Sequence, residues 1–537
     1  MARLNPRRDA SSEFDADDTV VPLRSAAANA KRKQRRNNTR HMAKIRERLI
    51  DIAVAVLNKD HAYIERGNDV CIVSMGRDYR GRLDLKFRNR IALTELYDSK
   101  RIKLPKINRD SVTYEWENPI KLWARHPNRR NLRGLVNVPG QHLSDEWLNL
   151  WAGWGTKPLL KDGTLDFSGE KCRLIISHIV NIWCSGNEVI ARWVLAWFAD
   201  IVQNPAKKPD TAIMAYSGQG TGKSFVVEHV MSKILGSGYG YEDSPEFLHA
   251  KFNKRVAGKL LIYADEAFFH GDKGAADRLK AFVSKKVITI EEKGKDSYET
   301  DHFARIVATT NRGHALAVDN DDRRWLILEV NEDRKKDYEY FAALEAEIEA
   351  GGVEAFHAFL LNPDLLTGIN LRETPDTPAM TKQKVQSLDT AEAFIYECLH
   401  AQTVELGHID TMRHDWPATV GKAEWYKAYT EWCKAQSKAF PRRDSQFGEI
   451  VKKLLKGIQD GRSGSANRHW KLPPIDEARA LFAHWIGCPD DRASLRVLWD
   501  DLEEDQRELS DDEFPVSIVS DVADVFGQKD PMDDVPF

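Results

Sequence analysis

The stretch TAIMAYSGQGTGKSFVVEHV (211–230) decides the fold, because it passes from a strand-like run through a glycine-rich loop to a helix-like run. TAIMAYS is a short apolar run typical of a strand, and the FVVEHVMSKIL that follows the loop is typical of a helix. Between them, GQGTGKS nearly matches G-x-x-x-x-G-K-[ST], the loop that joins a strand to a helix around phosphate groups. Inward-turned backbone N–H groups and the amino end of the helix favour anions there. The sequence therefore predicts a phosphate-binding loop in an α/β protein.

Within this loop, Lys223 is expected to reach the β and γ phosphates, and the hydroxyl of Ser224 to ligate Mg²⁺. The first motif position holds Ser217 where the pattern has glycine. A chance glycine-rich turn is the alternative, but the strand–loop–helix setting disfavours it. The residues expected to contact the nucleotide are Ser217, Gly218, Gln219, Gly220, Thr221, Gly222, Lys223 and Ser224.

Two further apolar runs lead to polar residues at their carboxyl ends. Leu260–Ala264 precedes Asp265 and Glu266. Asp265 is expected to hold Mg²⁺, and Glu266 to polarise an attacking water. Phe303–Ala308 leads to Asn311, whose amide would orient that water. An ordinary acidic turn after a buried strand is the alternative for the carboxylates, and the preceding phosphate loop weakens it.

A fourth β-like run follows two arginines in DDRRWLILEV. A guanidinium at Arg323 or Arg324 suits stabilisation of charge on a transferring phosphoryl group, in its own site or in that of a neighbouring subunit. A surface ion pair with Asp321 or Asp322 is the alternative. The pattern does not distinguish the two arginines.

Composition excludes several classes of protein. The chain has 537 residues and a net charge of −3, so its overall charge indicates no partner. The six cysteines form no CxxC pair and no metal-ligand spacing, which argues against a disulfide scaffold and a zinc cluster. The amino-terminal sequence lacks the apolar core of a signal peptide, and VIARWVLAWFADIV is too short to cross a bilayer. Most of the 15 tryptophans lie in helical stretches at core spacing, which favours packing over base stacking.

Charge and turn patterns divide the chain into seven expected parts. The segment from Lys31 to Arg48 contains nine basic residues and one acidic residue, a composition that favours disorder. This arm either contacts nucleic acid or is simply solvated. The parts are a disordered basic arm (1–41), an N-terminal α+β module (42–165), a helical collar (166–206), the core (207–335), a helical region and linker (336–385), a small α+β module (386–476), and a helical segment with a disordered acidic tail (477–537).

In this order, SGQGTGKS, YADEAFF, ATTNR and DDRRW resemble the superfamily 3 helicases, a branch of the AAA+ ATPases. More narrowly, the chain from about Trp123 to about Pro474 resembles the helicase portion of phage and plasmid primase-helicases. The resemblance implies an α/β fold: an AAA+ P-loop ATPase core with a helical N-terminal collar and a C-terminal winged-helix-like α+β module. It also implies ATP and Mg²⁺, a probable hexamer, and an arginine that completes the next subunit's site. No acidic pattern of a polymerising centre precedes LWARHPN, so a primase domain is not expected.

In that family a hairpin between the second and third elements grips DNA in the pore of the ring. The matching stretch is VITIEEKGKDSYETDHFAR, in which Lys293 and Lys295 flank Gly294 at an expected turn. The resemblance therefore implies that these lysines contact DNA. A solvated hairpin is the alternative.

The C-terminal module combines two amphipathic helices with a basic segment. GKAEWYKAYTEWCKAQ and SQFGEIVKKLLKGI each place apolar residues on one helical face, and GRSGSANRHWKL follows as a basic turn and strand. This order is typical of a winged helix and resembles the C-terminal module of the primase-helicases. A groove-reading role and a solvated basic face on a structural domain both stay open.

The last residues, DPMDDVPF, resemble the acidic tip of bacterial single-stranded-DNA-binding protein. A terminal phenyl ring would enter an apolar pocket, and the α-carboxylate would meet a basic residue. A disordered acidic end that finishes in phenylalanine by chance is the alternative. The residues expected to bind host replication proteins are Asp533, Asp534, Val535, Pro536 and Phe537.

These expectations combine into an ATP-dependent DNA helicase of phage or prophage replication. It would act on single-stranded or forked DNA in the cytoplasm of a bacterial host cell, without a membrane. The alternative is an origin-binding or loader-type AAA+ ATPase, for which ATP is an assembly switch and which does not unwind processively.

Overall fold

The computed structural model divides into two compact units, each of which is described by itself. Unit 1 is Met1–Glu65 with Asp69–Arg133, and unit 2 is Arg66–Asn68 with Gly134–Phe537. Lys293, Lys295 and the tail residues 533–537 lie outside the described residues. No helix among the described residues is long and apolar enough to span a membrane. The structure describes residues 23–66, 69–77, 83–108, 111–141, 143–244, 253–266, 273–291, 297–311, 313, 318–320, 322–406, 416–437, 441–463 and 467–499.

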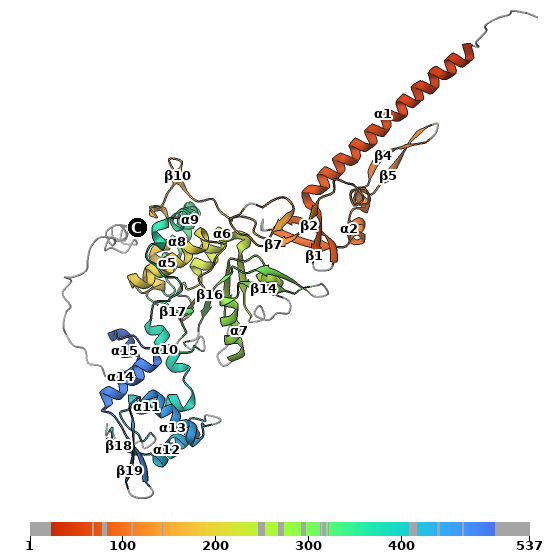
Figure 1. Ribbon diagram of the computed structural model, residues 1–537. Coiled ribbons are helices and arrows are strands. Elements are labelled where there is room, and N and C mark those ends of the chain that lie inside the picture. Colours follow the sequence, from red (N-terminus) through yellow and green to blue (C-terminus); the bar gives the residue numbers. More distant parts are fainter. Residues whose placement is uncertain are drawn as a thin grey trace, which may run out of the picture. The chain divides into compact units, whose positions relative to one another are not determined.

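Unit 1 is a long helix packed on a small sheet, with a hairpin beside the helix (Figure 1). The sheet has the order β3-β2-β1-β6, and β4 and β5 form a separate two-stranded hairpin. Val54 and Leu57 of α1 pack with Trp123 in a small apolar core. The elements are α1 (Leu23–Asp60), β1 (His61–Arg66), β2 (Asp69–Arg77), β3 (Leu83–Arg88), α2 (Arg90–Leu96), β4 (Ile102–Ile107), β5 (Val112–Glu117), α3 (Pro119–Trp123) and β6 (Asn131–Leu132).

The disorder expected for the basic arm (1–41) is wrong from Leu23 onward, while residues 1–22 lie outside the described residues. From Leu23 onward the arm is part of α1, which continues without a break to Asp60. Alanine, lysine, arginine and glutamine are good helix formers, and the carboxyl-terminal half of the helix is anchored by Val54 and Leu57. Repulsion between like charges costs only tenths of a kcal/mol per pair, about 0.2–0.5, so a charge run alone does not prevent a helix.

A five-stranded parallel sheet is the centre of unit 2. Its order is β12-β13-β16-β11-β17, and each of the four pairings is parallel. The four β-like runs expected from the sequence are confirmed as four of these strands, which are apolar and buried on both faces as in other parallel sheets. The strands are β11 (Ala212–Tyr216), β12 (Tyr239–Glu242), β13 (Leu261–Asp265), β16 (Arg305–Thr310) and β17 (Trp325–Glu329).

Helices cover both faces of this sheet. Ile213 and Ala215 face the core formed with α4, α5, α6, α8 and α9, while Ala212 and Met214 face α7, the β14–β15 hairpin and α10. The mixed α/β fold is thus confirmed. The bounds are α4 (Arg173–Ser177), α5 (Glu188–Gln203), α6 (Ser232–Leu235), α7 (Lys273–Ser284), β14 (Val287–Ile290), β15 (Tyr298–Asp301), α8 (Tyr338–Glu347), α9 (Val353–Leu360) and α10 (Pro378–Gln386).

The carboxyl-terminal part of unit 2 has its own aromatic core. Trp425 and Tyr429 of α12 meet Phe447 of α13, as the two amphipathic patterns predict. A three-stranded antiparallel sheet, in the order β18-β20-β19, lies beside them. The elements are α11 (Thr390–His400), β18 (Thr419–Gly421), α12 (Lys422–Ala435), α13 (Asp444–Leu454), β19 (Gln459–Ser463), β20 (Asn467–Lys471), α14 (Ile475–Ile486) and α15 (Arg492–Leu498).

The contacts also correct the expected boundary of the N-terminal module at residue 165. Residues 134–165, with β7 (Gly134–Val136) and β8 (Trp147–Asn149), belong to unit 2. The N–H of Gly155 donates to the carbonyl of Ile234 (2.7 Å), and Trp154 packs edge-on against His357 of α9, with ring centroids 5.8 Å apart. A loop-like composition does not reveal the domain on which a loop packs.

Candidate nucleotide-binding site

The loop after β11 adopts a conformation that needs glycine. Gly220 and Gly222 have φ angles of +77° and +86°, in the left-handed region that glycine enters without steric cost. A Cβ atom on Gly222 would lie 2.6 Å from Cε1 of His178, so a larger residue would also clash. After the loop, a helical segment begins at Phe225 and continues through Val226–Met231 into α6. The sequence thus forms the predicted strand–loop–helix unit.

Ser217, which stands where the motif has glycine, fits into this loop. Its hydroxyl lies 2.6 Å from the hydroxyl of Thr221, and both side chains are buried. The backbone N–H of Ser217 donates to the carbonyl of Thr310 on the neighbouring strand β16 (3.4 Å). The serine therefore satisfies its own polar group within the loop.

Lys223 bonds to groups that a phosphate could replace. Its Nζ donates to Oδ1 of Asn311 (2.5 Å) and to the carbonyl of Gly218 (3.1 Å). Burial lowers the pKa of Lys223, while the nearby carboxylates of Glu266 and Asp265 act in the opposite direction. Bound phosphate would stabilise the charged amine further, because opposite charges in a partly buried site attract strongly.

Asp265 and Glu266 are held at the carboxyl end of β13 by the end of β16. Thr309 donates from Oγ1 to Oδ1 of Asp265 (2.7 Å). Glu266 accepts from the hydroxyl of Thr310 (3.0 Å) and from the backbone N–H of Asn311 (2.7 Å). These bonds fix the direction of both carboxylates before any ligand is present.

Glu266 carries backbone strain. Its φ of +50° lies in the left-handed region, which costs a non-glycine residue about 1–3 kcal/mol. The N–H of Glu266 donates to the carbonyl of Thr309 (2.9 Å), so this turn away from the strand is hydrogen-bonded. The strained backbone and the two bonds to its carboxylate make Glu266 the most tightly oriented acid at this sheet edge.

Strand register explains why these groups meet. Asp265 pairs with Thr309 across β13 and β16, and Tyr216 pairs with Thr310 across β11 and β16. The carboxyl ends of three adjacent parallel strands therefore lie at one edge, where ligands bind in open α/β sheets. Of the site residues expected from sequence, the structure brings together Lys223, Asp265, Glu266 and Asn311.

The donor set suits magnesium bound together with phosphate. Mg²⁺ is usually held by one or two protein oxygens plus phosphate oxygens and water, and Ser224 and Asp265 offer a hydroxyl and a carboxylate. Over the described ranges, no group of three or more histidine, cysteine, aspartate or glutamate side chains forms a site for an isolated metal ion.

Two residues behind the loop were missed by sequence reasoning. His178 bridges two elements: its Nε2 donates to the carbonyl of Gly222 (3.0 Å), and the hydroxyl of Tyr340 donates to its Nδ1 (3.0 Å). Burial lowers the pKa of His178 to about 4, so the ring is neutral at physiological pH. The only sequence signal was a polar residue inside the apolar helix 172–183.

A charged segment after β17 also reaches the loop unexpectedly. Oε1 of Glu332 accepts the N–H of Gly218 (2.8 Å), and Nζ of Lys335 lies 2.7 Å from Oε2 of Glu332. Lys335 and the backbone of Gly218 lower the pKa of Glu332. The carboxylate thus uses a loop N–H that phosphate would also attract. The high charge of NEDRKKD indicates an exposed segment, but nothing in the sequence indicates that it contacts the phosphate loop.

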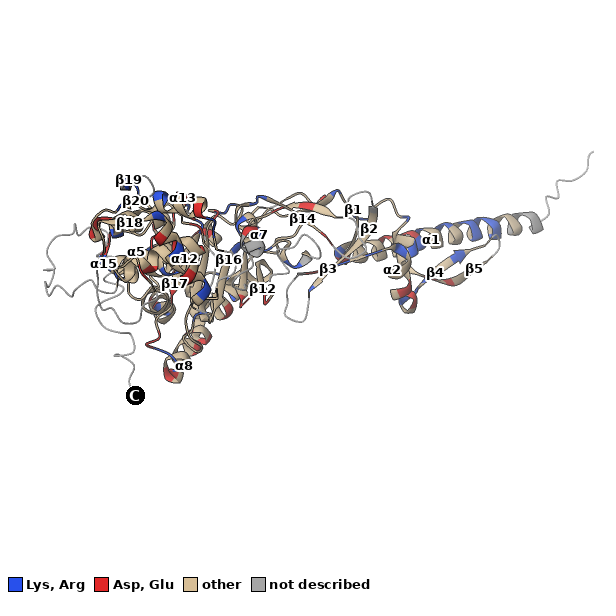
Figure 2. Ribbon diagram, turned by 90° about the horizontal axis from the view of Figure 1, so that it is seen from below, with Lys and Arg blue, Asp and Glu red and all other residues tan. Residues whose placement is uncertain are grey.

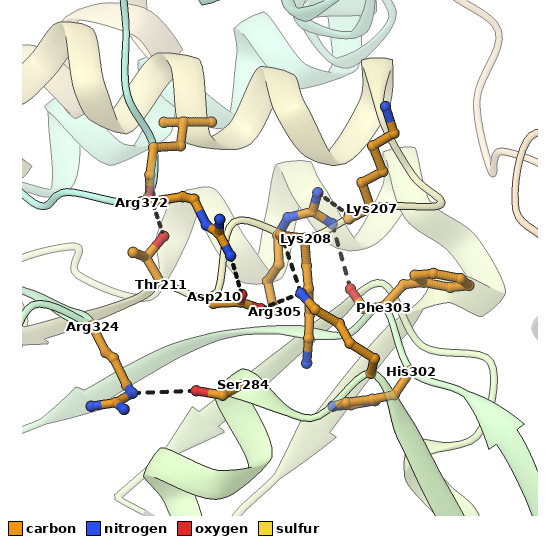
Figure 3. A network of polar contacts seen from close by, with 12 residues as sticks. Lys207, Lys208, Asp210, Thr211, Ser284, His302, Phe303, Arg305, Arg324 and Arg372 are labelled. Atoms are coloured by element: carbon orange, nitrogen blue, oxygen red, sulfur yellow. Dashed lines mark hydrogen bonds and ion pairs between the residues drawn. The ribbon is translucent and has the colours of Figure 1, made fainter.

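Arg323 and Arg324 lie at the opposite end of the sheet. The N–H of Ala212, at the start of β11, donates to the carbonyl of Arg324 (2.8 Å). Nε of Arg324 donates to Oγ of Ser284 (3.2 Å; Figure 3). Arg323 is exposed. The five-residue strand β11, about 17 Å long, separates both arginines from the phosphate loop of their own chain.

The expected pore hairpin is formed in part. β14 and β15 pair antiparallel, with Val287 opposite Asp301 and Ile290 opposite Tyr298. The two lysines of the turn lie outside the described residues, so their contact with DNA stays a prediction.

Comparison with known proteins identifies relatives of this fold. Residues 215–324 match a protein family described as a family of unknown function, DUF5906. The DNA primase-polymerase of Nitratiruptor phage NrS-1 is 22% identical over 211 residues, which are 38% of this chain and 28% of that protein. The alignment thus spans less than a third of the relative's length. It places this chain near a protein of phage replication.

Solved structures give the same relationship at the level of fold. The apo structure of the NrS-1 C-terminal region is 13% identical, with a TM-score of 0.53 over 78% of this chain and 98% of that chain. An A-form apo structure of that region is 12% identical, with a TM-score of 0.52 and the same coverage. The fold of this chain is therefore similar to that of the C-terminal region of the phage protein.

Proposed function

We propose that this chain is an ATP-dependent DNA helicase of phage or prophage replication, with an AAA+ core of superfamily 3 type. The convergence of Lys223, Asp265, Glu266 and Asn311 at one sheet edge is the observation that carries the proposal. The similarity to a phage DNA primase-polymerase supports a role in replication. The core would hydrolyse ATP, and the energy would move a DNA strand.

Nucleotide binding would exchange protein contacts for phosphate contacts. The β and γ phosphates would take Nζ of Lys223 away from Asn311 and Gly218, and the loop N–H groups would bond to phosphate oxygens. Ser224 and Asp265 would hold Mg²⁺, which neutralises charge on the phosphates. Release of Asn311 from Lys223 would free its amide for the attacking water.

Hydrolysis would use the oriented carboxylate. Water would attack the γ-phosphorus as Glu266 accepts its proton, the bond to the β-phosphate oxygen would break, and ADP and phosphate would form. Asn311 lies next to Glu266 through its backbone bond, so its side chain can position the same water. Because both residues follow adjacent strands, the geometry does not depend on a loop closing.

An arginine from a neighbouring subunit would complete the site. Neither Arg323 nor Arg324 reaches its own phosphate loop, and Arg323 is exposed at the sheet edge. A ring, as the hexamer of the similar helicases, would bring that edge to the next site. Lys293 and Lys295, which lie between β14 and β15 in the sequence, would contact the DNA, and the winged-helix-like part from α11 to β20 would supply a further DNA or structural surface.

Strand displacement is the decisive test of the proposal. The purified chain, with ATP and Mg²⁺, should separate forks that carry 3′ or 5′ single-stranded tails, and it should fail without ATP. Lys293→Ala with Lys295→Ala should keep basal ATP turnover but lose unwinding. ATP turnover without strand separation by the wild-type chain would instead favour an origin-binding or loader-type ATPase.

The acidic tail gives a separate proposal. Residues 533–537 would recruit host replication proteins, as the resemblance of DPMDDVPF implies. Deletion of Val535–Phe537 should abolish capture of those proteins and leave ATP turnover unchanged. Equal capture by the full and shortened chains would reject the tail as a binding element.

A further inference from the structure

Unit 1 exposes an aromatic surface that its own core does not use. On β5, the side chains of Tyr114 and Trp116 are 56% and 61% exposed, whereas Trp123 of the same unit is fully buried. Core spacing had favoured packing for the tryptophans, and Trp116 departs from that expectation. Two large rings on one strand of a two-stranded hairpin expose more apolar area than a solitary surface residue does, which indicates a binding role.

Strand register places the two rings on one face with a cation. Lys103 on β4 pairs with Trp116, and Pro105 pairs with Tyr114, so these four residues share a face of the hairpin. Nζ of Lys103 lies 5.0 Å from the ring centroid of Tyr114, a cation–π contact. The face therefore combines two flat apolar rings with one positive charge. We call it the aromatic face.

The other face of the hairpin is fixed to α1. Nη1 of Arg46 donates to the carbonyl of Pro105 (2.7 Å) and to Oε1 of Glu115 (2.9 Å). Lys106 also pairs with Glu115 (3.1 Å), so both cations lower the pKa of this carboxylate and offset its charge. Because Glu115 lies on the face opposite Tyr114 and Trp116, the aromatic face is not the face held by Arg46. The hairpin itself lies beside α1 (Figure 1).

The helix behind the hairpin carries a long positive stripe. Five exposed basic residues recur at four-residue intervals, so the row winds slowly around the helix. Lys44 and Arg48 each lie two residues from Arg46, which contacts the hairpin, so they lie on the side of the helix away from the hairpin. Figure 2 shows lysine and arginine along α1 next to β4 and β5. The residues of this basic stripe are Arg32, Arg36, Arg40, Lys44 and Arg48.

We propose that unit 1 binds single-stranded nucleic acid, with bases stacked on Tyr114 and Trp116 and a phosphate near Lys103, while the basic stripe adds attraction over a longer range. Base–aromatic stacking within a positive surface is the general mode of binding to single strands without sequence preference. A duplex buries the faces of its bases in its own stack, so the exposed rings select single strands. The inference deepens the proposed function by adding a polynucleotide contact outside the central sheet, and it requires no nucleotide hydrolysis.

Equilibrium binding of a fluorescent oligothymidylate to the full chain tests this inference. The measurement is made by anisotropy, without nucleotide, over a series of salt concentrations. Tyr114→Ser with Trp116→Ser should weaken binding at least tenfold at each salt concentration, because stacking is lost but phosphate contacts stay. Tyr114→Phe with Trp116→Phe keeps the rings and should bind within about threefold of wild type.

The cation of the aromatic face should respond to salt instead. Lys103→Gln should reduce the slope of log affinity against log salt by about 0.7, since each phosphate contact on a single strand contributes about 0.7. Lys103 and the rings lie in unit 1, so basal ATP turnover should match wild type in all three variants. Equal turnover also shows that unit 2 of each variant has folded.

Unchanged oligothymidylate affinity in the serine variant would overturn the inference. If the serine variant kept its affinity but sedimented differently from wild type, the aromatic face would instead be a contact between copies of the chain. The phenylalanine variant guards against misfolding, since a loss of binding there as well would show that the rings act through structure. If the wild type binds the oligonucleotide through these rings but never hydrolyses ATP, the inference stands and the helicase proposal fails.

Discussion

The carboxyl ends and the amino ends of the central strands, which we call the carboxyl edge and the amino edge of the sheet, both carry buried charge. The partners of the charged groups differ between the two. At the carboxyl edge, Lys223 bonds to one amide and one carbonyl, which a phosphate could replace. At the amino edge, the guanidinium of Arg305 is buried, with Nη2 2.6 Å from Oδ2 of Asp200. The same Nη2 lies 2.6 Å from the carbonyl of Lys207 (Figure 3). The other contacts of this guanidinium are also with protein carbonyls, and Nε, which has no hydrogen-bond partner among the described residues, is buried away from solvent.

The amino edge is closed by several such contacts. Nζ of Lys208 and Nε2 of His302 both donate to the carbonyl of Phe282 (3.2 Å each). Asp210 accepts from Lys286 (2.5 Å) and Arg372 (3.2 Å). The difference teaches that a charged cluster is a structural joint when its charges are paired with one another inside the protein, and a candidate site when its partners can be exchanged and the backbone around it is strained.

The largest effect should come from the carboxyl edge. Lys223→Ala should reduce ATP turnover by about 10³-fold, because it removes the cation that phosphate would bind. Its thermal midpoint should stay close to that of wild type, since the loop keeps its glycine conformation. Lys233→Ala, at an exposed position of α6, is the matched control and should turn over ATP as wild type does. If Lys223→Ala kept more than about a tenth of the wild-type ATP turnover, the carboxyl edge would not be an ATPase site that depends on this lysine.

The next largest effect should come from the amino edge. Arg305→Met should lower the free energy of unfolding by about 3–5 kcal/mol, because Asp200 keeps a buried charge without its partner. Urea unfolding followed by tryptophan fluorescence measures this loss. Adding Asp200→Asn to the same chain should recover part of it, since the amide carries no charge. An Arg305→Met chain as stable as wild type would show that this edge is not a structural joint.

A smaller effect should depend on pH. Burial, with Lys286 nearby, lowers the pKa of Lys208 from 10.5 to about 7, so the unfolded chain binds more protons between those pH values. The stability of the wild type should therefore rise from pH 7 to pH 10 by about 1–3 kcal/mol more than that of Lys208→Met. Urea midpoints of the two chains at pH 7, 8.5 and 10 provide the measurement. Parallel pH profiles would mean that Lys208 is not desolvated.

The smallest stability effect should distinguish the two arginines. Arg324→Ala loses a hydrogen bond to Ser284 and should destabilise the chain by about 1 kcal/mol, while Arg323→Ala should change stability by less than about 0.5 kcal/mol. If the exposed Arg323 completes a neighbouring site, only Arg323→Ala should lose turnover without losing stability. Mixing that variant with Lys223→Ala should then restore some turnover, because each chain supplies what the other lacks.

The sequence predicted the carboxyl edge better than its surroundings. Lys223, Asp265, Glu266 and Asn311 follow apolar runs, and parallel strands bring their carboxyl ends together, so local pattern sufficed. The contacts of His178 with Gly222 and of Glu332 with Gly218 depend on which helix and loop pass behind the site, and no local pattern encodes that. The helix α1 was missed because a charge run was given more weight than helix propensity and an anchored end.

Glu266→Gln tests the central claim most directly, because it changes one atom of the most tightly oriented acid. Binding of a fluorescent ATP analogue with Mg²⁺ and the turnover of ATP should be measured on the same preparation, with single-stranded DNA present. We predict that the variant binds nucleotide within a few fold of wild type but hydrolyses it about 10²-fold or more slowly. A wild-type chain that neither binds nor hydrolyses ATP, or a variant with undiminished turnover, would contradict the assignment of this sheet edge as an ATPase site.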